Sequence, residues 1–155
     1  MLIEVEVELK AGTITRKELD YQDRWQAIPI YDILAGIRTR VRITGRNDTD
    51  VTQRMGISWK VWDPDGVVVD EYSAWEVWPY TASGTEHEFV GGGFDLDKVG
   101  TYILEVGLYM NPDAPEMVDW YKDTICTVAV ALEYAGTITR KELEYDGSRE
   151  SIPVS

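Results

Sequence analysis

The sequence predicts an all-β protein built as a sandwich or a barrel, and two observations carry this prediction. First, apolar and polar residues alternate as they do in strands with one buried face, most clearly in Val5–Leu9, Ile37–Ile43 and Ile57–Val61. Second, segments rich in Gly, Pro, Asn and Asp recur at short intervals and predict turns. These segments lie at 45–50, 63–66, 82–84, 91–93 and 111–115. Short strands between frequent turns are typical of sandwiches and barrels.

Each run between two turn signals is predicted to be one strand, and no long helical pattern competes. The apolar run around Cys126 gives a strand near the end of the chain, in which a single cysteine is expected to be a buried, inert thiol. The strands predicted in chain order are 2–9, 12–21, 26–30, 37–44, 55–62, 67–74, 85–90, 100–110, 124–134, 136–145 and 150–154.

A long internal repeat organises the chain. The sequence AGTITRKELDY begins at Ala11 and returns as AGTITRKELEY at Ala135. At this offset of 124 residues (135 minus 11), 11–30 and 135–154 are identical at 12 of 20 positions. Upstream, VEVELKAG leads into the first copy and VAVALEYAG into the second. We expect both copies to form the same β-hairpin, which would connect the units of a tandem array; Asp146-Gly147 is a strong turn signal in the second.

Two segments at the centre of the chain carry a resemblance. In DLDKVGTYILEVGLYM, an acid, a small residue and a tyrosine stand at Asp97, Gly100 and Tyr102, and in MGISWKVWDPDG, Trp59 is followed by a tight turn. These segments resemble the approach to strand F with its corner tyrosine, and strand C with its inward tryptophan, of an immunoglobulin-like β-sandwich of the bacterial, archaeal and phage structural-protein type. The resemblance covers about residues 31–134 and implies a sandwich core.

The predicted fold class is therefore an all-β, immunoglobulin-like β-sandwich flanked by two homologous β-hairpin arms. We expect an N-terminal strand and arm at 1–30, the sandwich at 31–134 and a C-terminal arm at 135–155. From the inward positions of the strands that resemble C, F and G, one shared core is expected. Its members are Trp59, Tyr102, Leu104, Val106, Val128 and Val130.

The two arms are the first candidate binding surface. An opening strand and two hairpins leave free sheet edges, onto which another chain can add by main-chain hydrogen bonds while alternate side chains set the register. The predicted partner-binding side chains are Ile14, Arg16, Leu19 and Tyr21 in the first copy and Ile138, Arg140, Leu143 and Tyr145 in the second. In the competing account, both arms fold back on their own sandwich.

Two further sets of side chains are candidates for a protein partner. Alternation places Arg38, Arg40 and Arg42 on one strand face, where they could meet carboxylates of a neighbouring copy or form a solvated surface. In the segment YSAWEVWPY, alternation separates Trp75 from Trp78 and Tyr80, so that one set can be core. We assign Trp78 and Tyr80 to a partner surface, favouring protein over a stacked sugar.

Catalytic and metal sites are not predicted. His87 is the only histidine, no Gly-x-Ser-x-Gly elbow occurs, and His87 is expected to be an exposed strand residue. The 28 acidic residues are so widely scattered that they single out no carboxylate pair. The segments 47–50 and 63–66 hold oxygen ligands that calcium would accept, but both are also good β-turns. We expect no metal and no cofactor.

Charge and composition narrow the function. A net charge of −13 and a pI near 4.4 argue against nucleic acid, and no apolar run is long enough to span a membrane. The first ten residues do not form a signal peptide, so we expect a protein that stays where it is made, or an excised piece.

The predicted function is that of a non-enzymatic structural subunit that self-associates as a homo-oligomer or tandem assembly. This subunit is expected to belong to a phage or virus particle, a virion that is assembled in the cytoplasm. The alternative is a carbohydrate-binding or adhesion module of a cell-surface protein.

Overall fold

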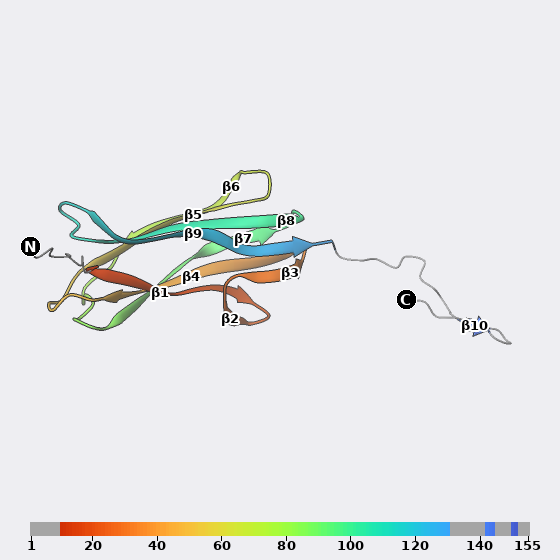
Figure 1. Cartoon of the computed structure of the whole chain (residues 1–155), viewed down its shortest axis with the longest axis horizontal. Helices are drawn as coiled ribbons and strands as arrows, with labels where there is room; N and C mark the ends of the chain where they lie inside the picture. Colours follow the sequence, from red (N-terminus) through yellow and green to blue (C-terminus); the bar gives the residue numbers. More distant parts are fainter. Residues whose placement is uncertain (1–9, 131–141, 145–149, 152–155) are drawn as a thin grey trace, which may run out of the picture.

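The computed structural model describes residues 10–130, 142–144 and 150–151, and residues 10–130 form a sandwich of two β-sheets. One sheet has four strands in the order β2-β1-β4-β7. Their bounds are Gly12–Tyr21 for β1, Arg24–Ala27 for β2, Ile37–Asn47 for β4 and Glu86–Leu96 for β7. In Figure 1, β1, β2 and β4 lie below β5, β6 and β8, which belong to the second sheet. The predicted all-β sandwich is confirmed.

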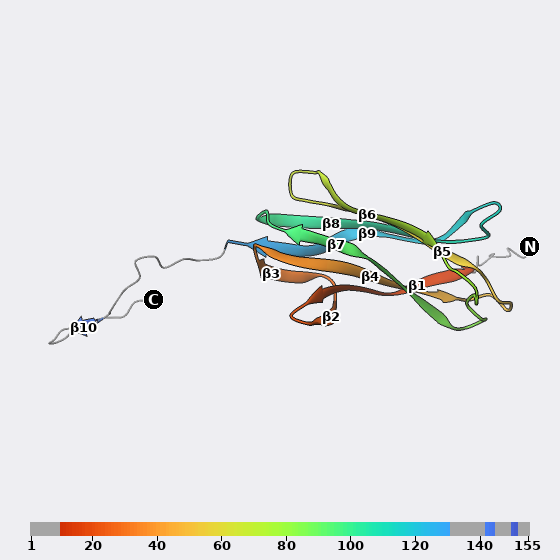
Figure 2. The ribbon, with the colours of Figure 1, turned by 180° about the vertical axis from the view of Figure 1, so that it is seen from behind.

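The second sheet has five strands in the order β3-β9-β8-β5-β6. Their bounds are Ile30–Leu34 for β3, Met55–Trp62 for β5, Val68–Trp75 for β6, Gly100–Met110 for β8 and Glu116–Ala129 for β9. β3 pairs with β9 in parallel, and the other strands of this sheet pair antiparallel. Figure 2 shows the same two layers from behind.

The first copy of the repeat is part of the sandwich and not an arm beside it. β1 pairs with β4 from Gly12↔Asn47 to Leu19↔Val41, and β2 closes a tight hairpin onto β1 through Tyr21↔Arg24. The sandwich therefore already includes β1, whereas a boundary at residue 31 was expected. The reason is burial: an amphipathic strand beside an open sheet edge hides its apolar side chains by joining that sheet.

The core lies between the two sheets and is formed by those residues of each strand that face the other sheet. Trp59, Tyr102, Leu104, Val106 and Val128 are buried in it, as expected. The sixth predicted member is wrong. Val130 is 60% exposed because β9 ends at Ala129, one residue earlier, where it pairs with Leu34 of β3.

Two contacts fix the core around its large aromatic residues. The Tyr102 hydroxyl accepts a hydrogen bond from the backbone N–H of Lys98 at 3.1 Å, which is the tyrosine corner that the resemblance implied. The Trp59 indole donates to the Asp70 carboxylate at 2.9 Å, while its ring occupies the space above Gly91. A Cβ added to Gly91 would lie 2.6 Å from the Trp59 ring, so glycine is required there.

Several predicted strand boundaries are wrong, among them 85–90, since β7 runs on through the turn predicted at 91–93 to Leu96. The segment 26–30 is not one strand: β2 ends at Ala27 and β3 begins at Ile30. β9 begins at Glu116 and not at 124, since pairing with β8 continues to Met110↔Glu116. In the first half of β9, EMVDWYK, apolar and polar residues do not alternate, which hid its strand character from an argument based on pattern.

In the second copy of the repeat, β10 (Glu142–Glu144) and β11 (Glu150–Ser151) form a two-stranded antiparallel sheet. The pair Glu142↔Ser151 corresponds, at the repeat offset, to Glu18↔Ala27 of the first copy. A register shift between Glu142 and Leu143, which β1 and β2 do not have, then pairs Leu143 with Ser151 and Glu144 with Glu150. The pairing of β10 with β11 thus agrees with the expected hairpin in part, and the expected strand at 2–9 lies outside the described residues.

Candidate binding groove on the outer face of the five-stranded sheet

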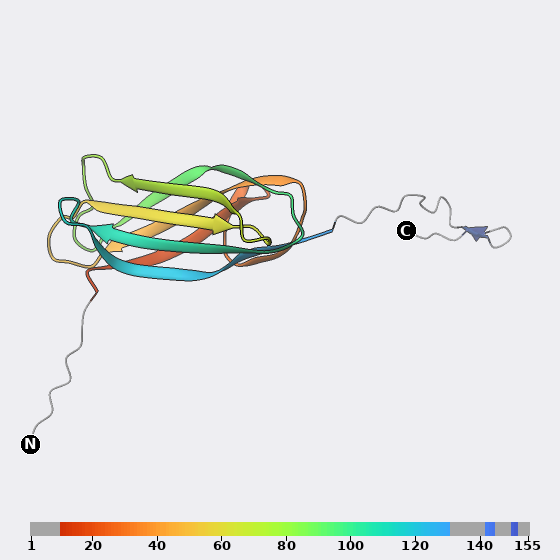
Figure 3. The ribbon, with the colours of Figure 1, turned by 90° about the horizontal axis from the view of Figure 1, so that it is seen from above.

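The outward residues of β5, β6, β8 and β9 form rows that cross the sheet. In the first row, Trp75 of β6 and Tyr109 of β8 flank Gly56 of β5, because Gly56 pairs with both. The next row contains Ser73, Ser58, Gly107 and Trp120. Figure 3 looks onto this sheet, with β6, β5, β8 and β9 lying side by side in that order.

Glycines in the two central strands let the aromatic rings lie down on the sheet. A Cβ added to Gly56 would be 2.6 Å from the Trp75 ring, and one added to Gly107 would be 3.0 Å from the Tyr109 ring. A glycine inside a strand often marks such a close approach. The Trp75 ring therefore lies close over Gly56, and the Tyr109 ring lies close over Gly107.

Between and beside these rings lies a groove with two connected parts, which we call the sheet-face groove. The larger part has a volume of about 310 Å³ and the smaller about 170 Å³, and Ser58 and Tyr109 line both. The larger part is lined further by Gly56, Ile57, Ser73, Ala74, Trp75 and Pro115. The smaller part is lined further by Trp59, Lys60, Glu105, Gly107, Met117 and Trp120.

Polar groups along the sheet-face groove are hydroxyls and charges of both signs. The Ser73 hydroxyl donates to the Ser58 hydroxyl at 2.8 Å. The Trp120 indole N–H donates to Glu105 at 3.1 Å, which holds that ring across the smaller part of the groove. The ammonium of Lys60, which also lines the smaller part, lies 3.8 Å from the Glu71 carboxylate.

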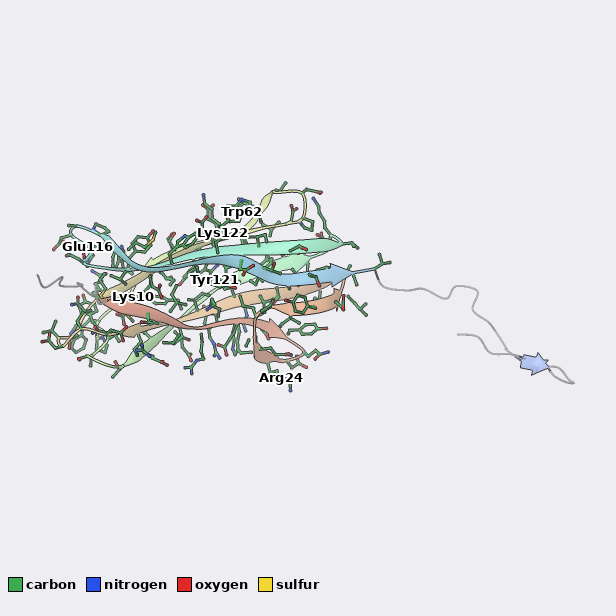
Figure 4. The ribbon with its side chains drawn as sticks, viewed as in Figure 1. Lys10, Arg24, Trp62, Glu116, Tyr121 and Lys122 are labelled. Atoms are coloured by element: carbon green, nitrogen blue, oxygen red, sulfur yellow. The ribbon has the colours of Figure 1, made fainter. Side chains whose placement is uncertain are left out.

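Next to the groove, on the same face of the sheet, a lysine ammonium lies over an aromatic ring. The Lys122 ammonium is 5.0 Å from the centre of the Trp62 ring, and Figure 4 places both side chains on the outer side of the sheet. Tyr121 lies on the opposite side of β9. Facing Lys122 across the strand pair is Glu105. Positive and negative charges thus alternate along this edge of the groove.

The predicted arginine row lies on the outer face of the four-stranded sheet, where its members meet acids of their own chain. Arg38 bonds Asp95 at 3.0 Å and Arg40 bonds Asp20 at 2.9 Å. Arg42 bonds Glu18 at 2.8 Å, and this hydrogen bond is the main cause of the raised pKa of the Arg42 guanidinium. The structure therefore places the row as an internally paired surface.

The predicted arm residues of the first copy differ in whether their side chains face the core of the sandwich. Ile14 and Leu19 are buried in their own sandwich, a correction to their assignment as contacts for a partner. Tyr21 packs partly against the same core, and Arg16 bonds Glu86 of β7 at 3.0 Å. Of the matching residues in the second copy, Leu143 lies in β10, and Ile138, Arg140 and Tyr145 lie outside the described residues.

The predicted aromatic pair lies away from the sheet-face groove, in the connection from β6 to β7. Trp78 is 79% exposed, and Tyr80 lies beneath the Arg54 guanidinium at 5.3 Å. Alternation allowed only one of the two sets to be core, and neither set belongs to the sandwich core. β6 ends at Trp75, so alternation does not continue through Val77.

The segment 63–66 forms a turn that is held by its own chain. The Asp63 carboxylate accepts backbone hydrogen bonds from Asp65 and Val67 and lies 3.0 Å from the Lys98 ammonium. The bond from Val67 is the largest influence on the Asp63 pKa, which lies below its usual value. Among the described residues, no three His, Cys, Asp or Glu side chains are placed to hold a metal ion.

His87 has a partner that the sequence did not reveal. Its Nδ1 lies 3.3 Å from the buried carboxylate of Glu76, which also accepts hydrogen bonds from the Met55 N–H and the Thr81 hydroxyl. This carboxylate ties the connection after β6 to β5. Cys126 is buried as predicted, and burial raises the pKa of its thiol to about 12.

Sequence analysis missed Tyr109, Met117 and Trp120 as groove residues. They lie far from Trp75 in the chain and become its neighbours only through the register of β5, β8 and β9. The available signal was the placement of Gly56 and Gly107 inside two predicted strands. Within the described part of the chain, no helix could cross a membrane.

Comparisons with known proteins support the fold. No protein-family model and no curated protein sequence matches the chain. Among solved structures, the C-terminal domain of Wzt has a TM-score of 0.55 and 14% identity, over 80% of this chain and 77% of that one. At this identity the likeness shows a shared β-sandwich fold alone.

Two further structures are similar at lower scores. A β-glucuronidase of glycoside hydrolase family 2 has a TM-score of 0.41 and 12% identity, over 59% of this chain and 10% of that one. Spo0M, a sporulation control protein from Bacillus subtilis, has a TM-score of 0.35 and 13% identity, over 76% of this chain and 51% of that one.

Proposed function

We propose that this protein is a non-enzymatic binding module and that the sheet-face groove takes an uncharged carbohydrate chain. The observation that carries the proposal is the pair of rings, Trp75 and Tyr109, which lie close over Gly56 and Gly107. A ring held this way offers a broad, weakly negative face. The C–H groups on one side of a sugar ring match such a face in shape and in charge.

The charges along the groove favour a neutral ligand. Lys60 and Lys122 are matched by Glu71 and Glu105 along the same edge. A polyanion or a polycation would meet as much repulsion as attraction there. The hydroxyls of Ser58 and Ser73 can instead exchange hydrogen bonds with sugar hydroxyls.

The position of the groove within the sheet favours a carbohydrate over a peptide strand. β5 and β8 are interior strands, each paired on both sides, so their backbone groups already serve the sheet. A peptide that binds by adding a strand needs a free sheet edge. A ligand in this groove must be recognised by side chains alone, and a sugar chain with its own donors and acceptors meets that requirement.

The test is affinity electrophoresis and calorimetry with soluble neutral polysaccharides: a β-glucan, a mannan and a galactan. We expect one of them to bind, and Trp75→Ala and Trp120→Ala each to weaken that binding about tenfold or more, which corresponds to about 1.4 kcal/mol. Trp78→Ala is the matched control, since it removes an exposed indole outside the groove.

Equal losses in Trp75→Ala and Trp78→Ala would contradict the groove as the site. Binding of none of the three polysaccharides, together with binding of an acidic polysaccharide or a peptide, would contradict the ligand class. The predicted virion and cell-surface locations are separate from this test and stay predictions.

A further inference from the structure

The first copy of the repeat fills a demanding position, which we call the β1 slot: the edge of β4 together with the part of the core beneath β1. Leu19 is fully buried there, and Ile14 is buried beside it. Position 12 favours glycine, because a Cβ added there would lie 3.0 Å from the side chains of Met110 and Val118. The slot thus selects a particular sequence.

The second copy of the repeat carries that sequence. All residues that pair with β4 lie within Gly12–Leu19, and the letters of 136–143 are identical to them. The Ile14 N–H donates to Asp119 of β9 at 2.8 Å, a backbone bond that any residue at this position can make. β10 and β11 also pair Glu142 with Ser151, as β1 and β2 pair Glu18 with Ala27. The second copy meets the requirements of a β1 slot.

The second copy cannot reach the β1 slot of its own sandwich. There, Ile138 would have to lie beside Asp119, ten residues back along β9 from Ala129. Ten residues of strand span about 33 Å. The nine residues from Ala129 to Ile138 cover at most about 32 Å when fully extended. They would also have to reverse direction and cross from one sheet to the other, about 10 Å away.

The path of the chain points the second copy toward another sandwich. β1 begins at one end of the molecule and β9 ends at the other, which we call the β1 end and the β9 end (Figure 1). Only residues 130–135 separate the last residue of β9 from the glycine that corresponds to Gly12. So short a connection would bring the β9 end of one sandwich against the β1 end of the next.

Both ends of the sandwich expose apolar side chains. At the β9 end, Leu34, Val99 and Val130 are exposed close together, since Leu34 pairs with Ala129 and Gly100 with Val128. At the β1 end, the exposed residues include Val51, Val77 and Trp78 in the connections that follow β4 and β6. Contact between unlike ends would remove both groups of apolar side chains from water, which stabilises the contact.

We propose that the β1 slot of one copy accepts residues 136–143 of a second copy, joining sandwiches end to end. The interface is heterologous, because the β9 end of each copy meets the β1 end of the next, and such contacts build linear arrays. Each sandwich in the array keeps a complete four-stranded sheet. The carbohydrate groove lies on the other sheet, and this inference does not depend on it.

The differences between the two copies explain how a single chain keeps its own β1 in place. The Trp25 ring stacks under the Arg42 guanidinium at 4.6 Å, and the corresponding residue of the second copy is Arg149, which would repel it. The Lys10 ammonium bonds Asp119 at 2.8 Å, and the second copy has Tyr134 there. The chain's own hairpin is therefore the stronger occupant, and exchange requires that it be displaced.

The test weakens one copy at a time in the full chain. Leu19→Asp spoils the chain's own β1 and leaves the second copy intact, so we expect a folded protein whose mass rises to multiples of the monomer mass as concentration increases. Leu143→Asp should stay monomeric. The double variant has the same damage in β1 but no intact second copy, so it should be monomeric and melt earliest. Light scattering after size-exclusion chromatography gives the masses, and circular dichroism gives the Tm.

A synthetic peptide of residues 135–155 makes the result decisive even if Leu19→Asp folds poorly. At one hundred times its Kd, the peptide should raise the Tm of the double variant by about 5 °C or more. The same peptide with Leu143→Asp is the control and should leave the Tm unchanged. The proposal is overturned if both peptides act alike, or if Leu19→Asp and the double variant have the same mass at every concentration.

Discussion

On the outer face of the four-stranded sheet, guanidinium groups meet carboxylates of neighbouring strands; on that of the five-stranded sheet, aromatic rings lie over glycines. Arg40 and Arg42 bond Asp20 and Glu18 across β1 and β4, and these charges satisfy one another within the chain. Trp75 and Tyr109 instead border a groove of about 310 Å³. The comparison teaches that exposure alone does not make a binding face, because a sheet surface with internally paired groups has little left to offer a partner.

The largest expected effect lies in the core that both faces share. Trp59→Ala should lower the free energy of unfolding by about 3–5 kcal/mol, because it empties a fully buried aromatic site and removes the indole bond to Asp70. Urea denaturation measures it. A loss below about 1 kcal/mol would mean that the two sheets do not depend on one core.

A matched pair of glycines gives the sharpest test of the comparison. Gly56→Ala places a Cβ 2.6 Å from the packed Trp75 ring and should cost about 1–3 kcal/mol of unfolding free energy, with a loss of carbohydrate binding. Gly93→Ala, on the other face, places a Cβ 2.7 Å from the Arg38 side chain. That exposed side chain can move aside, so the change should stay within about 0.5 kcal/mol. Similar costs at both positions would contradict the distinction.

The ion pairs of the four-stranded face should have smaller effects than the core tryptophan. Arg42→Ala should cost about 1–2 kcal/mol, because its bond to Glu18 is largely shielded from water and its guanidinium stacks on Trp25. Arg38→Ala should cost less than about 0.5 kcal/mol, since both members of the Arg38–Asp95 pair are well exposed. Thermal melts at low and high salt measure both, and neither variant should change carbohydrate binding.

Local pattern was enough to predict much of the fold. The strands 55–62 and 100–110 agree with β5 and β8 residue for residue, and the corner role of Tyr102 is confirmed. Both strands are interior, and every second residue of each strand is a large apolar residue that faces the core. The start of β9 at Glu116 was missed because the residues there pair with β8 without being buried and without a regular alternation of apolar and polar residues.

The types of residue in the candidate site could be predicted from the sequence, but their arrangement could not. The sequence showed that aromatic residues gather around Trp75, but the assignment went to Trp78 and Tyr80, which lie beyond the end of β6. The groove depends on which residue of β8 stands opposite Gly56, and one residue of register would exchange Tyr109 for a core position. Register is a property of the whole sheet, so no local pattern could supply it.

The parallel course of β1 and β9 has a mechanical consequence. Lys10 and Val130 lie at opposite ends of the sandwich, so tension between them acts along the strands. The hydrogen bonds between β1 and β4 lie across the strands. Such a pull therefore strains the bonds between Gly12 and Leu19 in shear, all together, and cannot peel them open singly. The hydrogen bonds that hold β1 in its slot therefore also let the sandwich bear tension.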